Sequence, residues 1–149
     1  MKAPSKNESI ALTSWLVAGP LPSPFHTAKS KSEALRVGYD NDFLAPLGGE
    51  GRFAINENTT ITLENGEKFG FSAHSWKGDY VNLVEVLGTA PQICAYLYCK
   101  VSANKRQTVW LHAGTNDAGK IWVGDKLVVE NPFDGGAMRS QFIVKVCLL

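Results

Sequence analysis

The segment "QICAYLYCKV", residues 92–101, decides the fold class because its side chains alternate with a period of two. One set of alternate positions holds Ile93, Ala95, Leu97, Cys99 and Val101, and the other holds Cys94, Tyr96, Tyr98 and Lys100. Such alternation is typical of a β-strand, whose successive side chains point to opposite faces of a sheet. The second set is aromatic rather than charged, so we expect both faces of this strand to be covered.

Two further segments show the same period. "TVWLHAG", residues 108–114, and "SQFIVKVCLL", residues 140–149, both predict strands. The polar segment "SANKRQ", residues 102–107, follows the first strand directly, and we predict a hairpin loop there.

Turn residues mark two more hairpins. In "TTITLENGEKFGFSA", residues 59–73, Asn65-Gly66 suits a type I′ turn because both residues tolerate positive φ. In "KIWVGDKLVV", residues 120–129, Gly124-Asp125 places glycine first, which suits a type II′ turn.

Two segments are predicted to be irregular loops. "VAGPLPSPF", residues 17–25, contains three prolines, and "YDNDFLAPLGGEGRF", residues 39–53, is rich in aspartate and glycine. Evidence for helix is thin: residues 28–37 suit a short helical turn or two, and residues 79–88 suit either a short helix or an extended segment.

Many short strands with Gly- and Pro-rich turns predict an all-β domain, an antiparallel β-sandwich of the jelly-roll type with one or two short helical turns. We assign it to residues 14–149 and expect the polar segment 1–13 to be disordered. A chain of 149 residues with a hydrophobic fraction of 44% can bury the core of one such domain.

Composition sets limits on the function. The net charge is +1 without a strongly basic cluster, so we expect no nucleic-acid partner. No apolar run is long enough for a membrane-spanning helix, so we expect no membrane partner. The first 15 residues lack the apolar segment of a signal peptide, so the protein is intracellular unless an export signal was removed or lies outside this sequence.

The cysteine count is odd, which argues against a closed disulfide framework. Cys94 and Cys99 face opposite sides of one predicted strand, and no cysteine–histidine spacing suits zinc. We interpret these two and Cys147 as buried free thiols.

The order of the motifs resembles that of galactose-binding-like β-sandwich modules, which are carbohydrate-binding modules appended to secreted bacterial glycan-degrading enzymes. The resemblance covers residues 14–147 and is carried by "WLVAGPLPSPF", "GYDNDFLAPLGGE", "SW…GDYVNLVEVLG", "AYLYCKV" and "GTNDAGKIWVGDKLVVEN". It implies a jelly-roll fold, a non-catalytic glycan-binding function, and an extracellular or periplasmic location if the chain is part of a larger secreted protein.

The sequence also departs from that family. The usual Ser-Asp-Asp-Gly is replaced by residues 115–119, "TNDAG", and the usual Asn-Gly turn by Gly124-Asp125. The family's final turn and strand have no counterpart before Leu149. Either the module is cut short here or another chain supplies the missing edge, and we therefore predict a homodimer or a domain swap.

The 39–53 segment suggests a metal site. Asp40, Asp42 and Glu50 provide the oxygen ligands that calcium prefers, although their spacing is not that of an EF-hand. The alternative is that the aspartates hydrogen-bond the backbone of their own loop.

Two groups of residues suit sugar binding, which combines an apolar surface with a few placed polar groups. The first contains Trp76, Asp79 and Tyr80, and Trp76 is expected to be exposed. The second contains Asn116 and Asp117, beside Trp122. In the alternative interpretation, the Asn-Asp loop is only a turn, and Trp122 and Trp110 are core or half-buried sheet residues.

Catalysis has weaker signals. A serine next to His74 in "SAHSW" could form a nucleophile–base pair, but there is no Gly-x-Ser-x-Gly motif. Glu50 and Asp117 could serve as paired glycosidase carboxylates only if a cleft brought them together. We therefore predict a non-enzymatic glycan-binding module. The alternative is a structural domain that dimerises through a sheet edge and has no sugar site, and a small hydrolase is the third class.

Overall fold

The computed structural model describes residues 9–22, 39–52, 54–89, 93–132 and 141–148. The predicted disorder of residues 1–8 and the predicted helical turn at residues 28–37 lie outside these residues. Residues 9–13 have no regular secondary structure, but the Trp15 indole N–H donates to the carbonyl oxygen of Leu12 at 2.8 Å. Contacts with the domain therefore begin within the segment predicted to be disordered.

The described elements are β1 (Ser14–Pro22), the 3₁₀ turn η2 (Ala45–Leu47), β2 (Thr60–Thr62), β3 (Lys68–Gly70), β4 (Ser72–Ser75), the helix α2 (Val84–Leu87), β5 (Ile93–Tyr98), β6 (Gln107–Ala113), β7 (Gly119–Val123), β8 (Lys126–Asn131) and β9 (Phe142–Leu148). The prediction of an all-β fold with short helical turns is confirmed. Among the described residues, no helix is long and apolar enough to cross a membrane.

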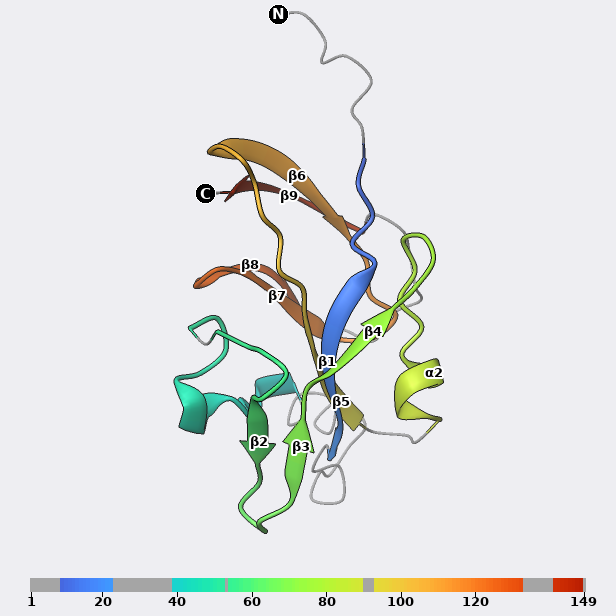
Figure 1. Cartoon of the computed structure of the whole chain (residues 1–149), viewed down its shortest axis with the longest axis vertical. Coiled ribbons are helices and arrows are strands. Elements are labelled where there is room, and N and C mark those ends of the chain that lie inside the picture. Colours follow the sequence, from blue (N-terminus) through green and yellow to red (C-terminus); the bar gives the residue numbers. More distant parts are fainter. Residues whose placement is uncertain (1–8, 23–38, 53, 90–92, 133–140, 149) are drawn as a thin grey trace, which may run out of the picture.

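All strand pairs among the described residues are antiparallel. β1 lies between β4 and β5, and the other strands form the pairs β2–β3, β6–β9 and β7–β8. In Figure 1 the β6–β9 and β7–β8 pairs lie one below the other, and β2–β3 lies at the opposite end of the long axis. The jelly-roll sandwich stays a prediction, because the described strands form four separate hydrogen-bonded groups.

The main core lies around β1. Its buried side chains are Ala18, Leu21, Leu44, Ile61 and Phe71, and the first two belong to β1 itself. Leu44 comes from the 39–52 segment, while Ile61 and Phe71 come from β2 and the residue after β3. The core therefore joins three segments that are far apart in the sequence.

The prediction of an irregular loop at residues 17–25 is wrong for residues 17–22, which belong to β1. The prolines are accommodated by an irregularity: the pairing with β5 shifts register between Ala18 and Leu21, and the peptide bond between Gly19 and Pro20 is cis. A Cβ at Gly19 would approach the carbonyl oxygen of Cys94 at 3.1 Å, so the two backbones come too close for a side chain here.

Both glycine-containing hairpins are confirmed, but one turn type is wrong. The N–H of Gly66 donates to the carbonyl oxygen of Leu63 at 2.9 Å, so Glu64 and Asn65 are the central turn residues. Gly66 follows them with a φ of 85°, which is a three-residue loop with a bulge rather than a type I′ turn. Gly124-Asp125 forms the expected two-residue turn between Val123 and Lys126.

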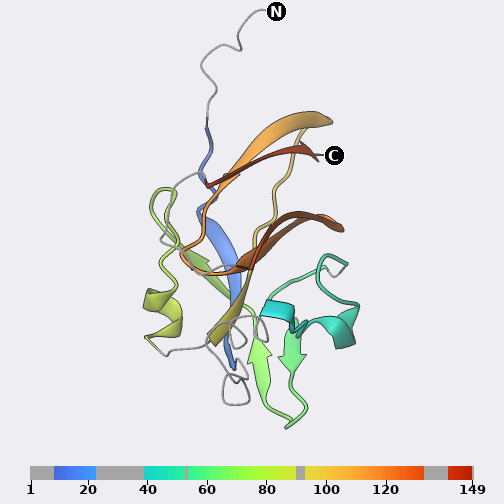
Figure 2. The same ribbon diagram turned by 180° about the vertical axis from the view of Figure 1, so that it is seen from behind.

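The predicted hairpin through residues 102–107 is wrong. β5 pairs with β1, with Val17 opposite Leu97, whereas β6 pairs with β9, with Leu111 opposite Val144. The polar segment therefore carries the chain from the β1 sheet to a separate ribbon. Figure 2 shows this β6–β9 ribbon at the end of the molecule away from β2–β3.

Candidate functional site

The loop after β4, residues 76–80, contains the first predicted group of sugar-binding residues. The backbone N–H of Trp76 donates to the carbonyl oxygen of Thr13 at 2.9 Å and fixes the start of the loop. Gly78 has a φ of 85°, which lets the chain turn sharply. Asp79 and Tyr80 follow on the surface, and 64% of Tyr80 is exposed. We call these five residues the β4 loop.

Trp76 is less exposed than predicted. It is half-buried, and its ring lies 6.0 Å from the ring of His74, with a tilt of 33° between the two planes. The two residues are two positions apart, and this spacing puts side chains on the same face of an extended chain. The contact holds Trp76 in place and leaves Tyr80 as the exposed aromatic ring of the loop.

His74 also contacts a serine, as one of the catalytic alternatives requires. Ser72 Oγ and His74 Nε2 are 2.8 Å apart. Within the described part of the chain, no carboxylate hydrogen-bonds to His74, so the third group that would orient a catalytic base is not among these residues. The pair therefore forms a local hydrogen bond on β4, beside the ring of Trp76.

The second predicted group lies in the connection between β6 and β7. The N–H of Thr115 donates to Gln141 Oε1 at 3.3 Å, and Asn131 Nδ2 donates to Thr115 Oγ1 at 3.4 Å. The Thr115 hydroxyl in turn donates to the carbonyl oxygen of Asp117 at 2.5 Å. These bonds fix a loop on which Asn116 and Asp117 are exposed. In Figure 1 this loop and the β4 loop both lie toward the side that carries α2.

Trp122 is separated from the exposed loops. It is half-buried on β7, and a Cβ added at Gly51 would collide with the indole ring. Its Nε1 is buried and has no hydrogen-bond partner among the described residues. The structure therefore favours the alternative of a half-buried sheet residue, because the 39–52 segment packs against the ring that a sugar would need.

Trp110 does not fit the alternative in which it is a core or half-buried sheet residue. Its side chain is 58% exposed at the centre of β6. Ile143, on the paired strand β9, is 56% exposed, so this face of the β6–β9 ribbon has large apolar side chains in solvent. The period of two identified the face, but nothing in the sequence showed that it is uncovered.

The proposed calcium ligands have other partners. Asp42 Oδ1 accepts from the N–H of Leu44 at 2.9 Å, and Asp42 Oδ2 accepts from the N–H of Glu50 at 3.1 Å. Asp40 is exposed. In the described ranges, no group of three or more His, Cys, Asp or Glu side chains could hold a metal ion. The structure favours the alternative in which Asp42 stabilises the turns of its own loop.

Glu50 connects the same loop to two strands. The Tyr96 hydroxyl donates to Glu50 Oε1 at 2.8 Å and accepts from the N–H of Phe43 at 3.1 Å. Lys120 Nζ lies 3.6 Å from Glu50 Oε2 and 4.6 Å from the centre of the Tyr39 ring. These contacts cover the aromatic face of β5, and sequence analysis identified neither tyrosine as part of a polar cluster.

Two tyrosine pKa values reflect this environment. Burial raises the pKa of Tyr96 far above its ordinary value of 10, and the hydrogen bond and charge of Glu50 raise it further. Burial, followed by the negative charge of Glu130, raises the pKa of Tyr39 to about 12. By distance and angle, no described group accepts a hydrogen bond from the Tyr39 hydroxyl, so we attribute that rise to desolvation and charge.

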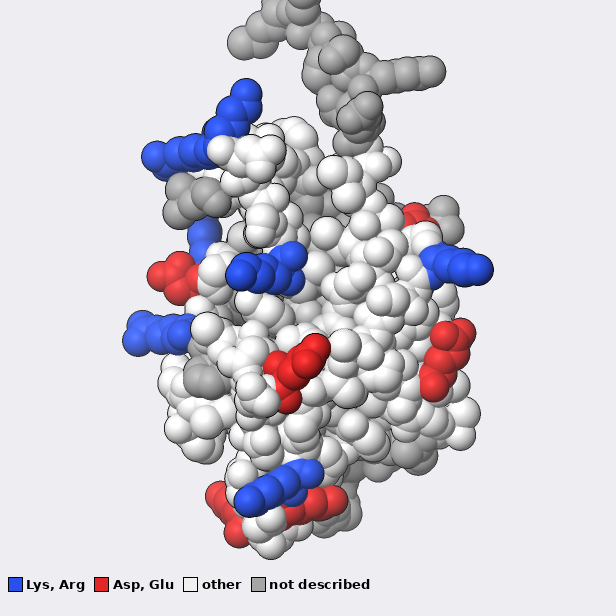
Figure 3. Space-filling view, viewed as in Figure 1, with Lys and Arg blue, Asp and Glu red and all other residues white. Residues whose placement is uncertain are grey.

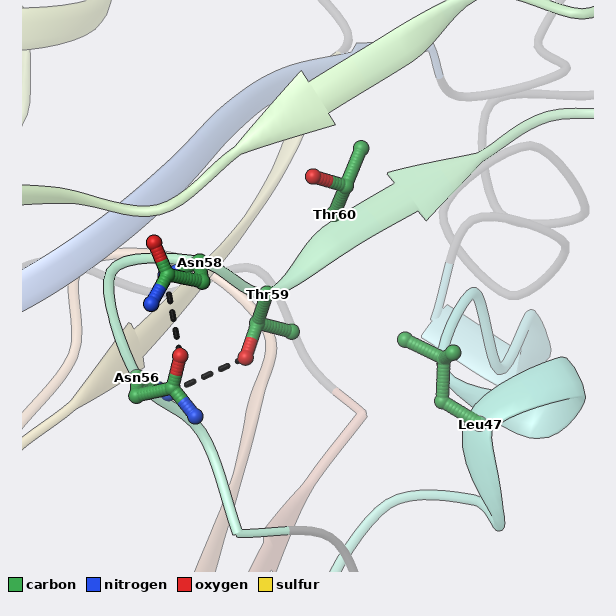
Figure 4. A pocket seen from close by; sticks show the side chains of 5 residues that line it. All are labelled: Leu47, Asn56, Asn58, Thr59 and Thr60. Carbon is green, nitrogen blue, oxygen red and sulfur yellow. Dashed lines mark hydrogen bonds between the residues drawn. The ribbon is translucent and has the colours of Figure 1, made fainter.

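A shallow pocket of about 300 Å³ lies near the other end of the molecule. Leu47, Asn56, Asn58, Thr59 and Thr60 line it (Figure 4). The N–H of Asn56 donates to Thr59 Oγ1 at 3.0 Å, and the N–H of Asn58 donates to Asn56 Oδ1 at 2.9 Å. Several of its polar groups thus fix a local turn, and the pocket contains none of the predicted site residues.

None of the three cysteines forms a disulfide; Cys94 and Cys99 are half-buried, and Cys147 is exposed rather than buried as predicted. On the face drawn in Figure 3, basic and acidic side chains are scattered among neutral ones.

Comparison with known proteins gives no relative: no family model, no curated protein and no solved structure matches this chain.

Proposed function

We propose that this chain is a non-catalytic carbohydrate-binding domain that holds a glycan through the β4 loop. The observation that supports this most is the exposed ring of Tyr80 next to the exposed carboxylate of Asp79. A sugar ring presents a C–H face to an aromatic ring and hydroxyl groups to polar side chains, so this loop offers both kinds of contact. The resemblance to galactose-binding-like jelly-roll modules of secreted bacterial enzymes supports the same class of ligand.

The supporting residues form a pre-organised base for this contact. Trp76 is held between its backbone hydrogen bond to Thr13 and its ring contact with His74. A fixed aromatic group loses little conformational entropy when a ligand binds. Asn116 and Asp117 stay a predicted second contact, and Trp122 is left out of the proposed site. An extracellular or periplasmic location belongs to the proposal, because bacterial polysaccharides are met there.

Affinity electrophoresis in gels containing soluble xylan, galactan, galactomannan or mixed-linkage glucan tests the proposal. We expect at least one polysaccharide to retard the protein, and Tyr80→Ala to weaken that binding at least about 10-fold, since exposed tyrosines commonly dominate binding sites. Ile143→Ala is the control, because its side chain is exposed to a similar degree on a different element. Retardation lost in Ile143→Ala but kept in Tyr80→Ala, or absent with every polysaccharide, would contradict the proposal.

A further inference from the structure

The strand β6 lies at an outer edge of the molecule. Within the described residues β6 hydrogen-bonds to β9 alone, while β9 also contacts β8. Figures 1 and 2 agree that β6 is the outermost strand of this group, with β9 between it and the β7–β8 pair. None of the described strands pairs with the other edge of β6, and an edge of this kind can add a further strand.

This edge lacks the usual protection against pairing. Natural edge strands avoid association by being short or by carrying lysine, proline or a bulge. β6 has seven residues, "QTVWLHA", with no formally charged side chain and no proline. Its pairing with β9 runs from Gln107 to Ala113 without a register shift, so the strand has no bulge either.

We propose that β6 pairs antiparallel with β6 of a second copy of this chain, about a twofold axis at Trp110. Trp110 is the central residue of the strand, and the side-chain pattern on its two sides is symmetric in character. Such a pairing sets Val109 opposite Leu111 and Thr108 opposite His112 of the second copy. Apolar groups then meet apolar groups on the half-buried face, and two exposed indole rings meet on the other face.

The basic residues next to β6 do not oppose this arrangement. Lys105 and Arg106 come directly before the strand and are exposed. Figure 3 shows basic side chains at the end of the ribbon where β6 begins. Antiparallel pairing about Trp110 places the basic ends of the two copies at opposite ends of the paired strands, so like charges do not meet at the axis.

The proposal differs from packing of two ribbons face to face. Face-to-face packing would bury Ile143 as well as Trp110, since both side chains are exposed on paired strands. Edge pairing places Trp110 at the symmetry axis and Ile143 one strand further away. The β6 edge also differs from the edge that the sequence suggested, which is the one left by a missing strand near the C-terminus.

Sedimentation velocity over a range of protein concentrations, in reducing buffer because Cys147 is exposed, tests the proposal. We expect a monomer–dimer equilibrium for the wild type. Trp110→Lys places two like charges at the axis and is expected to weaken the dimer at least about 100-fold. Ile143→Lys, the matched control at a similarly exposed position, is expected to keep the dimer. Thr108→Lys serves as a second edge variant if circular dichroism shows that Trp110→Lys does not fold.

A wild type that stays monomeric up to its solubility limit would overturn the proposal. Equal loss of the dimer in Trp110→Lys and Ile143→Lys would also overturn it, because that result indicates face-to-face packing. The outcome is independent of the carbohydrate proposal, since Tyr80 lies on another element and its substitution leaves β6 intact.

Discussion

The β1 sheet and the β6–β9 ribbon both have strands with alternating side chains, but they differ in what covers them. Every described residue of β5 is at least half-buried, and β1 contributes two residues to the main core. On the ribbon, Trp110 and Ile143 are exposed on one face while Val146 is buried on the other. The difference shows that a period of two predicts a strand and its two faces, whereas tertiary contacts decide whether one or both are covered.

The largest expected contrast comes from shortening one apolar side chain in each region. Leu21 is fully buried, and Leu21→Ala should lower the free energy of unfolding by about 3 kcal/mol, through lost burial and a cavity. Ile143→Ala removes an exposed side chain and should change it by less than about 0.5 kcal/mol. Urea denaturation measures both, and similar losses in the two variants would remove the distinction between the regions.

A smaller effect is expected from Tyr96→Phe on the covered face of β5. The variant leaves Glu50 Oε1 and the N–H of Phe43 without the tyrosine hydroxyl, which should cost about 1–2 kcal/mol of unfolding free energy. Tyr98→Phe is the matched control, because the Tyr98 hydroxyl makes no hydrogen bond among the described residues and lies on the same face of the strand. Equal stability of the two variants would show that the 39–52 segment is held by other contacts.

A third effect, confined to alkaline pH, is a loss of stability when Tyr39 ionises. In the unfolded chain Tyr39 loses its proton near pH 10, whereas in the folded protein it keeps the proton until about pH 12. Between these two pH values ionisation of Tyr39 favours the unfolded state, so stability falls as the pH rises. The stabilising contribution of the protonated Tyr39 is fully present below pH 10. The slope is at most about 1.4 kcal/mol per pH unit for one tyrosine. Urea midpoints measured from pH 9 to 12 should fall less steeply in Tyr39→Phe than in the wild type.

Local signals in the sequence were sufficient for most strand positions. The alternation in β5, β6 and β9 and the hairpins at Gly66 and Gly124 were predicted correctly, although the turn type at Gly66 was not. Strand partners were not, since β5 and β6 are adjacent in sequence but pair with β1 and β9. Pro20 and Pro22 also hid a strand, because a register shift between Ala18 and Leu21 lets β1 continue to Pro22.

The loops of the candidate site were predictable from the sequence, but the solvent exposure of their side chains was not. The sequence identified the segment with Trp76, Asp79 and Tyr80, whose turn residue Gly78 is visible in the sequence. It predicted exposure for Trp76, whereas the contact with His74 leaves that ring half-buried. Trp110 was expected to be covered and is exposed. The two errors have different causes: His74, which covers part of Trp76, is only two residues away, whereas the exposure of Trp110 depends on which strands cover the β6–β9 ribbon.

The indole N–H signals of the four tryptophans, followed by nuclear magnetic resonance, test most directly whether a glycan binds at the β4 loop and not at β6. Trp76 reports on the β4 loop, Trp110 on the edge of β6, and Trp122 on the covered side of β7. We predict that oligosaccharides cut from the polysaccharide that binds will shift the Trp76 signal and leave Trp110 unchanged. A ligand-dependent shift at Trp110 with no change at Trp76 would contradict the account.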